Sequence, residues 1–283
     1  MILVTGATGN IGGDLVRALV RDGHAVRALS RDADKAKRAL GGGVEIAVGD
    51  FGDAQSIASA LRGVDRAFFV SNAGPKLADT AGAFADAAAA AGVRRIVAIS
   101  SSTIAFEPPT TIGKWHLALE ERVRSTKLAW TFLRPGNFAS NALRWAHPIK
   151  TQGAVFSTNA EGRSAPIDPF DIAAVAHAAL TQDGHEGKTY VLTGSKTTSM
   201  REQVEAIGKA IGKPLRVVVV PEEGARKGML ASGMPEIMAD AVLELVRATT
   251  SGGELQSTHV RDVLGRDART FDDWLADHVA AFT

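Results

Sequence analysis

A glycine-rich turn close to the first residue constrains the fold of this chain more than any other feature. The apolar run Ile2–Val4 meets three glycines, and an amphipathic pattern then follows, with Leu15, Val16 and Leu19 on one face. Strand, glycine-rich turn and helix in this order are the context that a dinucleotide-binding turn requires, because the phosphates lie on free N–H groups at the positive end of the helix. The residues that we expect to bind the dinucleotide are Gly6, Thr8, Gly9, Asn10, Ile11 and Gly12.

Each glycine of this turn has its own physical reason. Gly6 permits a tight turn, Gly9 lets the backbone approach a pyrophosphate, and Gly12 removes a Cβ where helix and strand pack closely. Glycine-rich turns can also serve only to connect two elements. The matching neighbours on both sides favour the binding interpretation.

The composition excludes several classes of function. A net charge of +1 gives no electrostatic case for binding nucleic acid or an anionic membrane. With 0 cysteines the chain has no disulfides, thiolate metal sites or cysteine nucleophile, and its 7 histidines lack metal-ligand spacing, so we expect no metal. No apolar stretch reaches the roughly 20 residues that span a bilayer, and no leader precedes the first strand. We expect a soluble, cytoplasmic protein.

Through the first half of the chain, β-rich runs alternate with helical patterns, which is typical of a parallel sheet covered on both faces. The expected strands are Ile2–Thr5, Ala25–Leu29, Glu45–Val48, Arg66–Phe69, Arg95–Ile99 and Ala129–Arg134. The expected helices are Gly12–Asp22, Asp34–Leu40, Ala54–Leu61, Ala78–Ala91 and Lys114–Ser125. The predicted fold class is α/β, a Rossmann-type doubly wound parallel sheet with the carboxyl ends of its strands on one edge.

Beyond Pro135 the pattern becomes less regular. We expect a single domain over residues 1–283, in which 1–135 mainly binds the cofactor and 136–283 contributes most of a small C-terminal α/β lobe over the substrate. This lobe looks too short and irregular to hold an independent core. The expected elements are helices Asp171–Leu180 and Glu222–Val246, strands Thr189–Leu192 and Arg216–Val220, and helices opened by capping boxes at Ser199 and Thr270.

The end of the second strand indicates which dinucleotide is bound. A fold that prefers NAD places a carboxylate there for the ribose 2′-hydroxyl, whereas this strand ends in Ser30 and Arg31. A guanidinium can bind a 2′-phosphate bidentately, so we expect NADPH rather than NADH, with Arg27 as an additional candidate reader. The neighbouring Asp32 should point away. The alternative is that Arg31 is a solvated surface side chain.

Residues after the third and fourth strands are candidates for the adenosine end of the cofactor. Asp50 is placed to accept from the adenine amino group and Phe51 to lie against the ring, although a turn role for Asp50 is as well supported. Ser71 and Asn72 should lie under the ribose and phosphates, and Asn72 should act mostly through its backbone.

The loops after the fifth and sixth strands should meet the nicotinamide. Ser101 can bond a substrate carbonyl or the nicotinamide amide, or it can satisfy loop backbone. Pro135 and Asn137 leave the sixth strand beside the nicotinamide, and Phe138 can face the substrate. The aromatic residues that form either a substrate pocket or lobe core are Trp115, Phe138 and Trp145, with lobe core favoured for Trp145.

Several motifs together resemble a known superfamily. These are Thr5–Gly12, the serines Ser100–Ser102, Thr131–Phe138 with Asn141, Pro166–Asp171, and Thr189–Gly194. The chain is similar to atypical short-chain dehydrogenases/reductases of the NmrA-like NAD(P)H-binding branch, which includes type-2 NADPH quinone oxidoreductases and triphenylmethane reductases. The resemblance implies a Rossmann fold, NADP(H) binding and reduction of quinones or related conjugated carbonyls. It also makes Asn141 a candidate for contact with substrate, and some relatives bind the nucleotide without known catalysis.

The chain departs from the standard members of that superfamily at the proton donor. They use a Tyr-xxx-Lys pair, but the 1 tyrosine here, Tyr190, lies in a late strand. Where the pair would begin, His116 and Glu120 stand four residues apart on one helix face. His116 can donate a proton and Lys114 can supply positive charge to a developing enolate. Alternatively, His116 and Glu120 form an ordinary helix pair.

A site without tyrosine is still competent for some acceptors. Hydride addition to a quinone gives a delocalised anion that solvent can protonate, whereas the alkoxide of a simple ketone needs a donor in place. We therefore expect an NADPH-dependent reductase of a quinone or similar conjugated carbonyl or aromatic small molecule, working as a monomer or homodimer. The alternative is a non-catalytic protein that senses NADP(H) and regulates a partner.

Overall fold

A seven-stranded sheet forms the centre of the protein, for which a computed structural model describes residues 1–251 and 255–283. Its strands are β1 (Ile2–Val4), β2 (Val26–Ser30), β3 (Val44–Val48), β4 (Arg66–Phe69), β5 (Arg95–Ile99), β6 (Ala129–Pro135) and β9 (Lys188–Leu192). They lie in the order β3-β2-β1-β4-β5-β6-β9, and each pairing is parallel. The predicted Rossmann-type sheet is confirmed, and the carboxyl ends of its strands share one edge.

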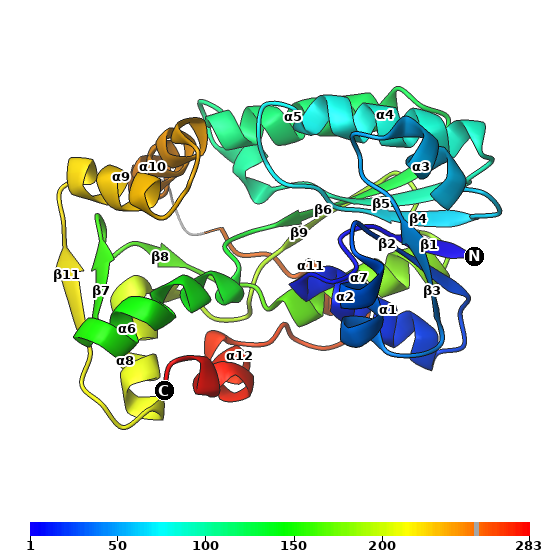
Figure 1. Ribbon diagram of the computed structural model, residues 1–283. Coiled ribbons are helices and arrows are strands. Elements are labelled where there is room, and N and C mark those ends of the chain that lie inside the picture. The colour runs from blue at the N-terminus through cyan, green and yellow to red at the C-terminus, as the bar shows by residue number, and fades with distance from the viewer. Residues whose placement is uncertain (252–254) are drawn as a thin grey trace.

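Helices cover both faces of this sheet (Figure 1). One face carries α1 (Asn10–Arg21), α2 (Ala33–Leu40), α7 (Pro169–Thr181) and α11 (His259–Leu264), and the other carries α3 (Ala54–Ala60), α4 (Leu77–Ala90) and α5 (Thr111–Arg124). Leu15 of α1 and Ile172 of α7 belong to one buried apolar layer, and Phe84 of α4 and Leu119 of α5 belong to the other. Burial of these two layers is the main favourable contribution to the stability of the sheet.

The last strand of the sheet comes from the second half of the chain. We expected a strand at Thr189–Leu192, and the structure pairs it with β6 so that Leu133 stands opposite Tyr190. The strand belongs to the main sheet, and the helix before it, α7, packs against α1. The nucleotide-binding half of the fold therefore draws on residues well beyond Pro135.

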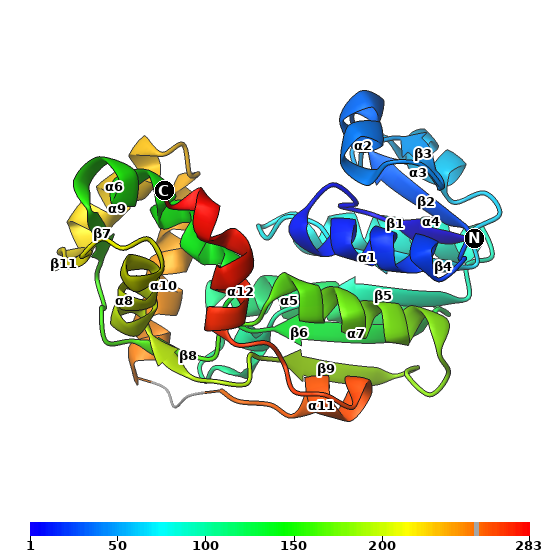
Figure 2. The same cartoon turned by 90° about the horizontal axis from the view of Figure 1, so that it is seen from below.

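The remaining elements form a lobe beyond the carboxyl edge of the sheet (Figure 2). They are η2 (Ala139–Trp145), α6 (Ala146–Gln152), β7 (Ala154–Ser157), β8 (Arg163–Ser164), β10 (Thr198–Ser199), α8 (Met200–Ala210), β11 (Arg216–Val219), α9 (Glu222–Ala231), α10 (Glu236–Ser251), α12 (Phe271–His278) and η3 (Val279–Ala281). Strand β7 pairs with β11, and β8 with β10. The expected continuous helix Glu222–Val246 is instead two helices, because Gly233 at φ +86° and Pro235 interrupt it.

The lobe has a hydrophobic core of its own, contrary to our expectation. Val155, Val204, Phe271 and the fully buried Trp274 form a cluster separate from the two layers of the sheet, and Trp145 packs against it. The core assignment favoured for Trp145 is confirmed. The residues of the lobe core come from five elements spread over more than a hundred residues of the sequence, which is why the sequence pattern did not reveal this core.

Both expected capping boxes are present, at Ser199 before α8 and at Thr270 before α12. Within residues 1–251 and 255–283, no helix combines the length and apolar character needed to cross a membrane.

Candidate functional site

Two glycines of the first turn occupy positions that a side chain cannot enter. Gly6 has φ +58°, and a Cβ there would lie 2.5 Å from Cγ1 of Val70. A Cβ on Gly12 would lie 2.2 Å from the carbonyl oxygen of Gly6, well inside contact distance. Gly6 therefore makes the tight turn and Gly12 lets α1 approach the turn, as the sequence indicated.

The N-terminus of α1 offers unsatisfied donors at the carboxyl edge of the sheet. Gly9 is the N-cap and has no side chain to accept from the first-turn amides, so the N–H groups of Asn10 and Ile11 are free for a ligand. The helix dipole adds positive potential at the same place. This cradle fits the pyrophosphate of a dinucleotide. Thr5, which we did not single out, bonds the backbone of Val70 through its hydroxyl and so joins the turn to the end of β4.

The end of β2 presents Ser30 and Arg31, and the Ser30 hydroxyl donates to the carbonyl of Asp32 at 2.9 Å. Arg31 is 83% exposed, and its Nε lies 3.9 Å from Oδ2 of Asp50. Asp32 turns away as expected, since its carboxylate accepts from the N–H of Lys35 and caps α2. Arg27 is different: it forms an ion pair with Glu45 and also donates to two backbone carbonyls. Arg27 is therefore not available for a phosphate.

The two candidates for adenine are already engaged in protein contacts. Oδ1 of Asp50 accepts from the N–H of Gly52, which is the turn role that we considered as an alternative. The ring of Phe51 packs against Phe69 and Phe84, with centroids 5.4 and 6.0 Å away. Phe51 is thus held in the α3–α4 layer. Ser71 and Asn72 follow β4 directly at the carboxyl edge, Ser71 half-buried and Asn72 exposed.

A buried carboxylate joins the ends of β5 and β6. Glu120 is fully buried in α5 and accepts from Ser100 at 2.7 Å, from Arg124 at 2.8 Å, and twice from Arg134 at 2.7 Å. Burial alone would raise the pKa of this carboxyl, but the bonds from Arg134 and Ser100 and the arginine charges outweigh it and lower the pKa. Arg134 is a residue that we missed. The signal available was a charged residue at the end of an otherwise apolar strand.

His116 lies one turn before Glu120, but the structure shows no hydrogen bond between them. Its Nδ1 bonds the carbonyl of Ile112 at 2.9 Å, which leaves Nε2 as the nitrogen open to a ligand. Burial lowers the pKa of the imidazole below its usual 6.5, against the opposing effects of Ile112 and Glu120. The imidazole is therefore mainly neutral near pH 7, and Glu120 acts on it through its charge and not through a hydrogen bond.

The neighbours of His116 on α5 point elsewhere. Lys114 is exposed. The pKa of Glu244 on α10 is lowered mainly by hydrogen bonds from Thr111, and the charge of Lys114 lowers it further. Trp115 is half-buried and packs against the apolar layer between the sheet and α4–α5.

The loops after β5 and β6 contain a mixture of engaged and open side chains. Ser101 Oγ bonds the hydroxyl and accepts from the N–H of Thr103, so it caps η1 (Ser102–Ala105) as the loop alternative proposed. Asn137 is exposed and accepts at 2.9 Å from the side chain of Asn141. Phe138 packs partly against the core beside Ile167.

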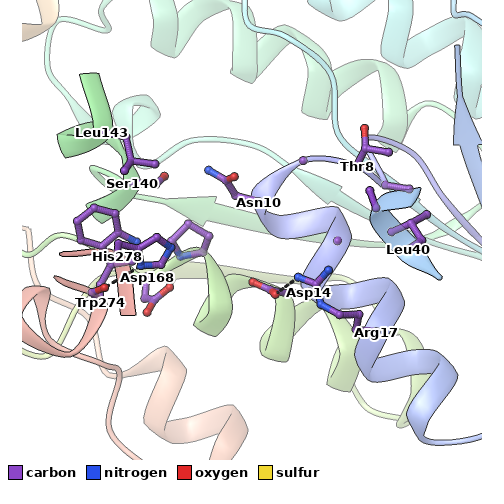
Figure 3. A pocket seen from close by; sticks show the side chains of 15 residues that line it. Thr8, Asn10, Asp14, Arg17, Leu40, Ser140, Leu143, Asp168, Trp274 and His278 are labelled. Carbon is purple, nitrogen blue, oxygen red and sulfur yellow. Dashed lines mark hydrogen bonds and ion pairs between the residues drawn. The ribbon is translucent and has the colours of Figure 1, made fainter. Parts of the chain in front are cut away.

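A cavity of about 270 Å³ lies next to the glycine turn, between α1 and the lobe (Figure 3). The residues labelled along it include Thr8, Asn10, Asp14 and Arg17 from the turn and α1, Ser140 and Leu143 from η2, and Trp274 and His278 from α12. Asp168 also lines it, as the N-cap of α7. The lobe therefore forms one wall of a cleft whose other wall is the glycine turn.

Comparison with known proteins agrees with this architecture. The family described as NAD(P)H-binding matches residues 6–183. The NAD(P)H azoreductase of Xenophilus azovorans is 39% identical over 100% of this chain and 99% of that protein. The (4-alkanoyl-5-oxo-2,5-dihydrofuran-3-yl)methyl phosphate reductase of Streptomyces griseus is 38% identical over 100% and 99%.

A solved structure shares the fold over almost the whole chain. The NADPH-dependent quinone oxidoreductase of Escherichia coli, crystallised with NADPH, gives a TM-score of 0.86 at 25% identity and covers 98% of this chain and 99% of its own. The chain therefore belongs to the NAD(P)H-binding, NmrA-like branch of the atypical short-chain dehydrogenases/reductases, and it is an NAD(P)H-dependent oxidoreductase.

Proposed function

We propose that this protein uses NADPH to reduce a quinone or a similar conjugated carbonyl or aromatic acceptor. The observation that carries the proposal is the place of its 1 tyrosine. Tyr190 is the middle residue of β9, and its hydroxyl shares a 2.8 Å hydrogen bond with Nδ1 of His185, which precedes that strand at its amino end. A site without a tyrosine donor suits acceptors whose reduced anion is delocalised, because solvent can protonate such an anion.

The similar proteins support the same class of acceptor. An azo group, a quinone and a 4-alkanoyl-5-oxo-2,5-dihydrofuran are all flat π systems in which added negative charge is spread over several atoms. Simple ketones lack this property. We infer that the acceptor of this protein is conjugated.

The preference for NADPH over NADH rests on the end of β2. Ser30 and the exposed guanidinium of Arg31 follow β2, and we expect them to meet the ribose 2′-phosphate, since the carboxylate of Asp32 is engaged in capping α2. The first-turn amides of α1 would hold the pyrophosphate. When bound, NADPH supplies the hydride.

We assign proton donation to Nε2 of His116. Its other ring nitrogen is held by Ile112, so only Nε2 can transfer a proton. Because burial lowers the pKa, the imidazolium becomes more populated as pH falls below 6.5, and His116 should contribute most under acidic conditions.

Phe138, Asn137 and Asn141 follow β6 at the carboxyl edge, and we propose that they face the acceptor. Trp115 and Lys114 have less support, since the first packs against the core and the second lies on the exposed side of α5 near Glu244. Ser101, engaged in capping η1, would act by holding its loop in place.

The proposal is tested by mixing purified protein and NADPH with a panel of acceptors and following the absorbance of NADPH. The panel contains a quinone, an azo dye, a conjugated lactone and a saturated cyclic ketone. Turnover of the conjugated acceptors and not of the ketone supports the proposal. Reduction of the ketone at a comparable rate contradicts it, and tight NADPH binding without turnover of any acceptor would instead favour a sensor.

A further inference from the structure

The carboxylate of Glu120 connects three elements that surround the proposed reaction site. It lies in α5, one turn after His116, and binds Ser100 at the end of β5 and Arg134 near the end of β6. All four of its hydrogen bonds are between 2.7 and 2.8 Å, and its side chain is 0% exposed. Such a buried, fully bonded carboxylate holds its partners in one geometry.

Both strand partners immediately precede the loops of the site. Ser100 leads into Ser101 and Ser102, while Arg134 leads into Pro135 and Gly136. These loops face each other, since a Cβ on Gly136 would lie 3.8 Å from Oγ of Ser102. A backbone hydrogen bond also joins the two strand ends, since the N–H of Ser100 donates to the carbonyl of Leu133 at 2.7 Å. The Glu120 contacts thus set the spacing between the two loops and their distance from α5.

The arrangement depends on the negative charge and on the shape of the arginine. Glu120 accepts from Arg134 through both carboxylate oxygens, and this fork fixes the direction of the side chain as well as its distance. Lysine in place of arginine would keep the charge but offer a single mobile ammonium.

Arg124 provides a natural comparison. It also bonds Glu120, but from the same helix, and its guanidinium lies over the rings of Trp130 and Phe132, 4.9 and 4.8 Å from their centroids. It therefore supports the fold around Glu120 without reaching the loop that follows β6.

We propose that Glu120 is a positioning residue which, through the Arg134 fork and Ser100, fixes the nicotinamide end of the site. The inference rests on the proposed function, because it takes the loops after β5 and β6 to be the ones that meet the nicotinamide and the acceptor. Glu120 itself touches neither reactant.

The test compares Arg134→Lys with Arg124→Lys, which both weaken a charged contact to Glu120. Replacement of Glu120 itself would leave Ser100 and two partly buried arginines without their shared acceptor and threatens folding, so the two arginines are the sharper choice. Melting temperature, the Kd for NADPH, the fluorescence of bound reduced nicotinamide, and kcat and KM with a quinone are measured for each variant.

We expect both variants to melt at a lower temperature. In Arg134→Lys the enhancement of nicotinamide fluorescence on binding should shrink and kcat should fall by about tenfold, with the Kd for NADPH within about twofold of the parent because the pyrophosphate contacts are intact. Arg124→Lys should leave the fluorescence and kcat unchanged.

The positioning role would be overturned if Arg134→Lys and Arg124→Lys changed the fluorescence and kcat equally, in proportion to the fall in melting temperature of each variant. If no acceptor is reduced by the parent protein, the proposed function fails, and the fluorescence comparison still decides the role of Glu120 by itself.

Discussion

The glycine turn and the ends of β5 and β6 are shaped by different kinds of contact. In the turn, backbone atoms meet backbone atoms, and the absence of side chains at Gly6 and Gly12 makes the approach possible. At the ends of β5 and β6, side chains from α5 and two strands converge on Glu120. A backbone contact has almost no freedom to adjust, whereas a substitution in a network of side chains removes one hydrogen bond and leaves the others in place. Substitutions should therefore act sharply in the turn and by degrees at the strand ends.

The largest effect is expected from Gly12→Ala. A Cβ there would lie 2.2 Å from the oxygen of Gly6, so α1 must move away from the turn. We expect the free energy of unfolding to fall by about 2–3 kcal/mol and the Kd for NADPH to rise by more than about tenfold. Denaturant unfolding and fluorescence titration measure the two quantities.

Gly13→Ala is the matched control, one residue further along the same helix. A Cβ at Gly13 would meet the mobile end of Arg17 at 3.4 Å and the carbonyl oxygen of Ala7 at 3.6 Å, which are ordinary contact distances. This variant should therefore bind NADPH normally and be slightly more stable, by about 0.5–1 kcal/mol. If Gly12→Ala binds NADPH as tightly as Gly13→Ala does, the turn can accommodate a side chain at Gly12, and the claim that its backbone contacts cannot adjust is wrong.

The next effect is expected from Arg31→Ala. Loss of the guanidinium should raise the Kd for NADPH by about tenfold and leave the Kd for NADH unchanged, since only NADPH carries the 2′-phosphate. Arg38→Ala removes one positive charge from the exposed side of α2 and serves as the control. If Arg31→Ala raises the Kd for NADPH and the Kd for NADH equally, Arg31 does not recognise the 2′-phosphate and contributes only its positive charge.

His116→Gln should change the pH dependence of catalysis. Burial lowers the pKa of His116 below 6.5, and its proposed role needs the protonated ring, so kcat with a quinone should rise as pH falls through and below 6.5 in the parent. In His116→Gln we expect a flat profile and a kcat lower by about tenfold on the acid side. His147→Gln, at an exposed position in the lobe, should keep the parental profile.

The smallest effect is expected from Asn141→Ala, which removes a single 2.9 Å bond to the exposed Asn137. A hydrogen bond of this kind contributes about 0.5–1.5 kcal/mol, so KM for the acceptor should rise by about threefold, with no change in the Kd for NADPH. A KM that stays at the parental value would place Asn137 outside the acceptor site.

The sequence predicted the turn well because the information there is local. Gly6 and Gly12 lie within seven residues of each other, and the apolar strand and amphipathic helix flank them directly. The first six strands were also placed to within one residue at each end, since buried parallel strands form short apolar runs.

The strand ends were harder to predict because their partners are distant in the sequence. Helical spacing suggested that Glu120 pairs with His116, but Arg134, fourteen residues away, holds it instead. Spacing also cannot say which face of the sheet an aromatic residue joins, and Phe51 packs against Phe69 and Phe84 on the face covered by α3 and α4. Its contact with adenine stays a prediction. The pairing of β9 with β6 depends on the whole sheet and leaves no local pattern.

The packing of α7 on α1 also bears on how the chain folds as it leaves the ribosome. Leu15, Val16 and Leu19 of α1 share one apolar layer with Ile172 and Val175 of α7, which are made about 150 residues later. Until α7 emerges, α1 packs only on the strands and α2, and the part of its apolar face that α7 covers stays exposed. We expect nascent chains that end near Pro135 to expose it and to depend on chaperones, so the nucleotide-binding half should become protease-resistant only after β9 has been synthesised.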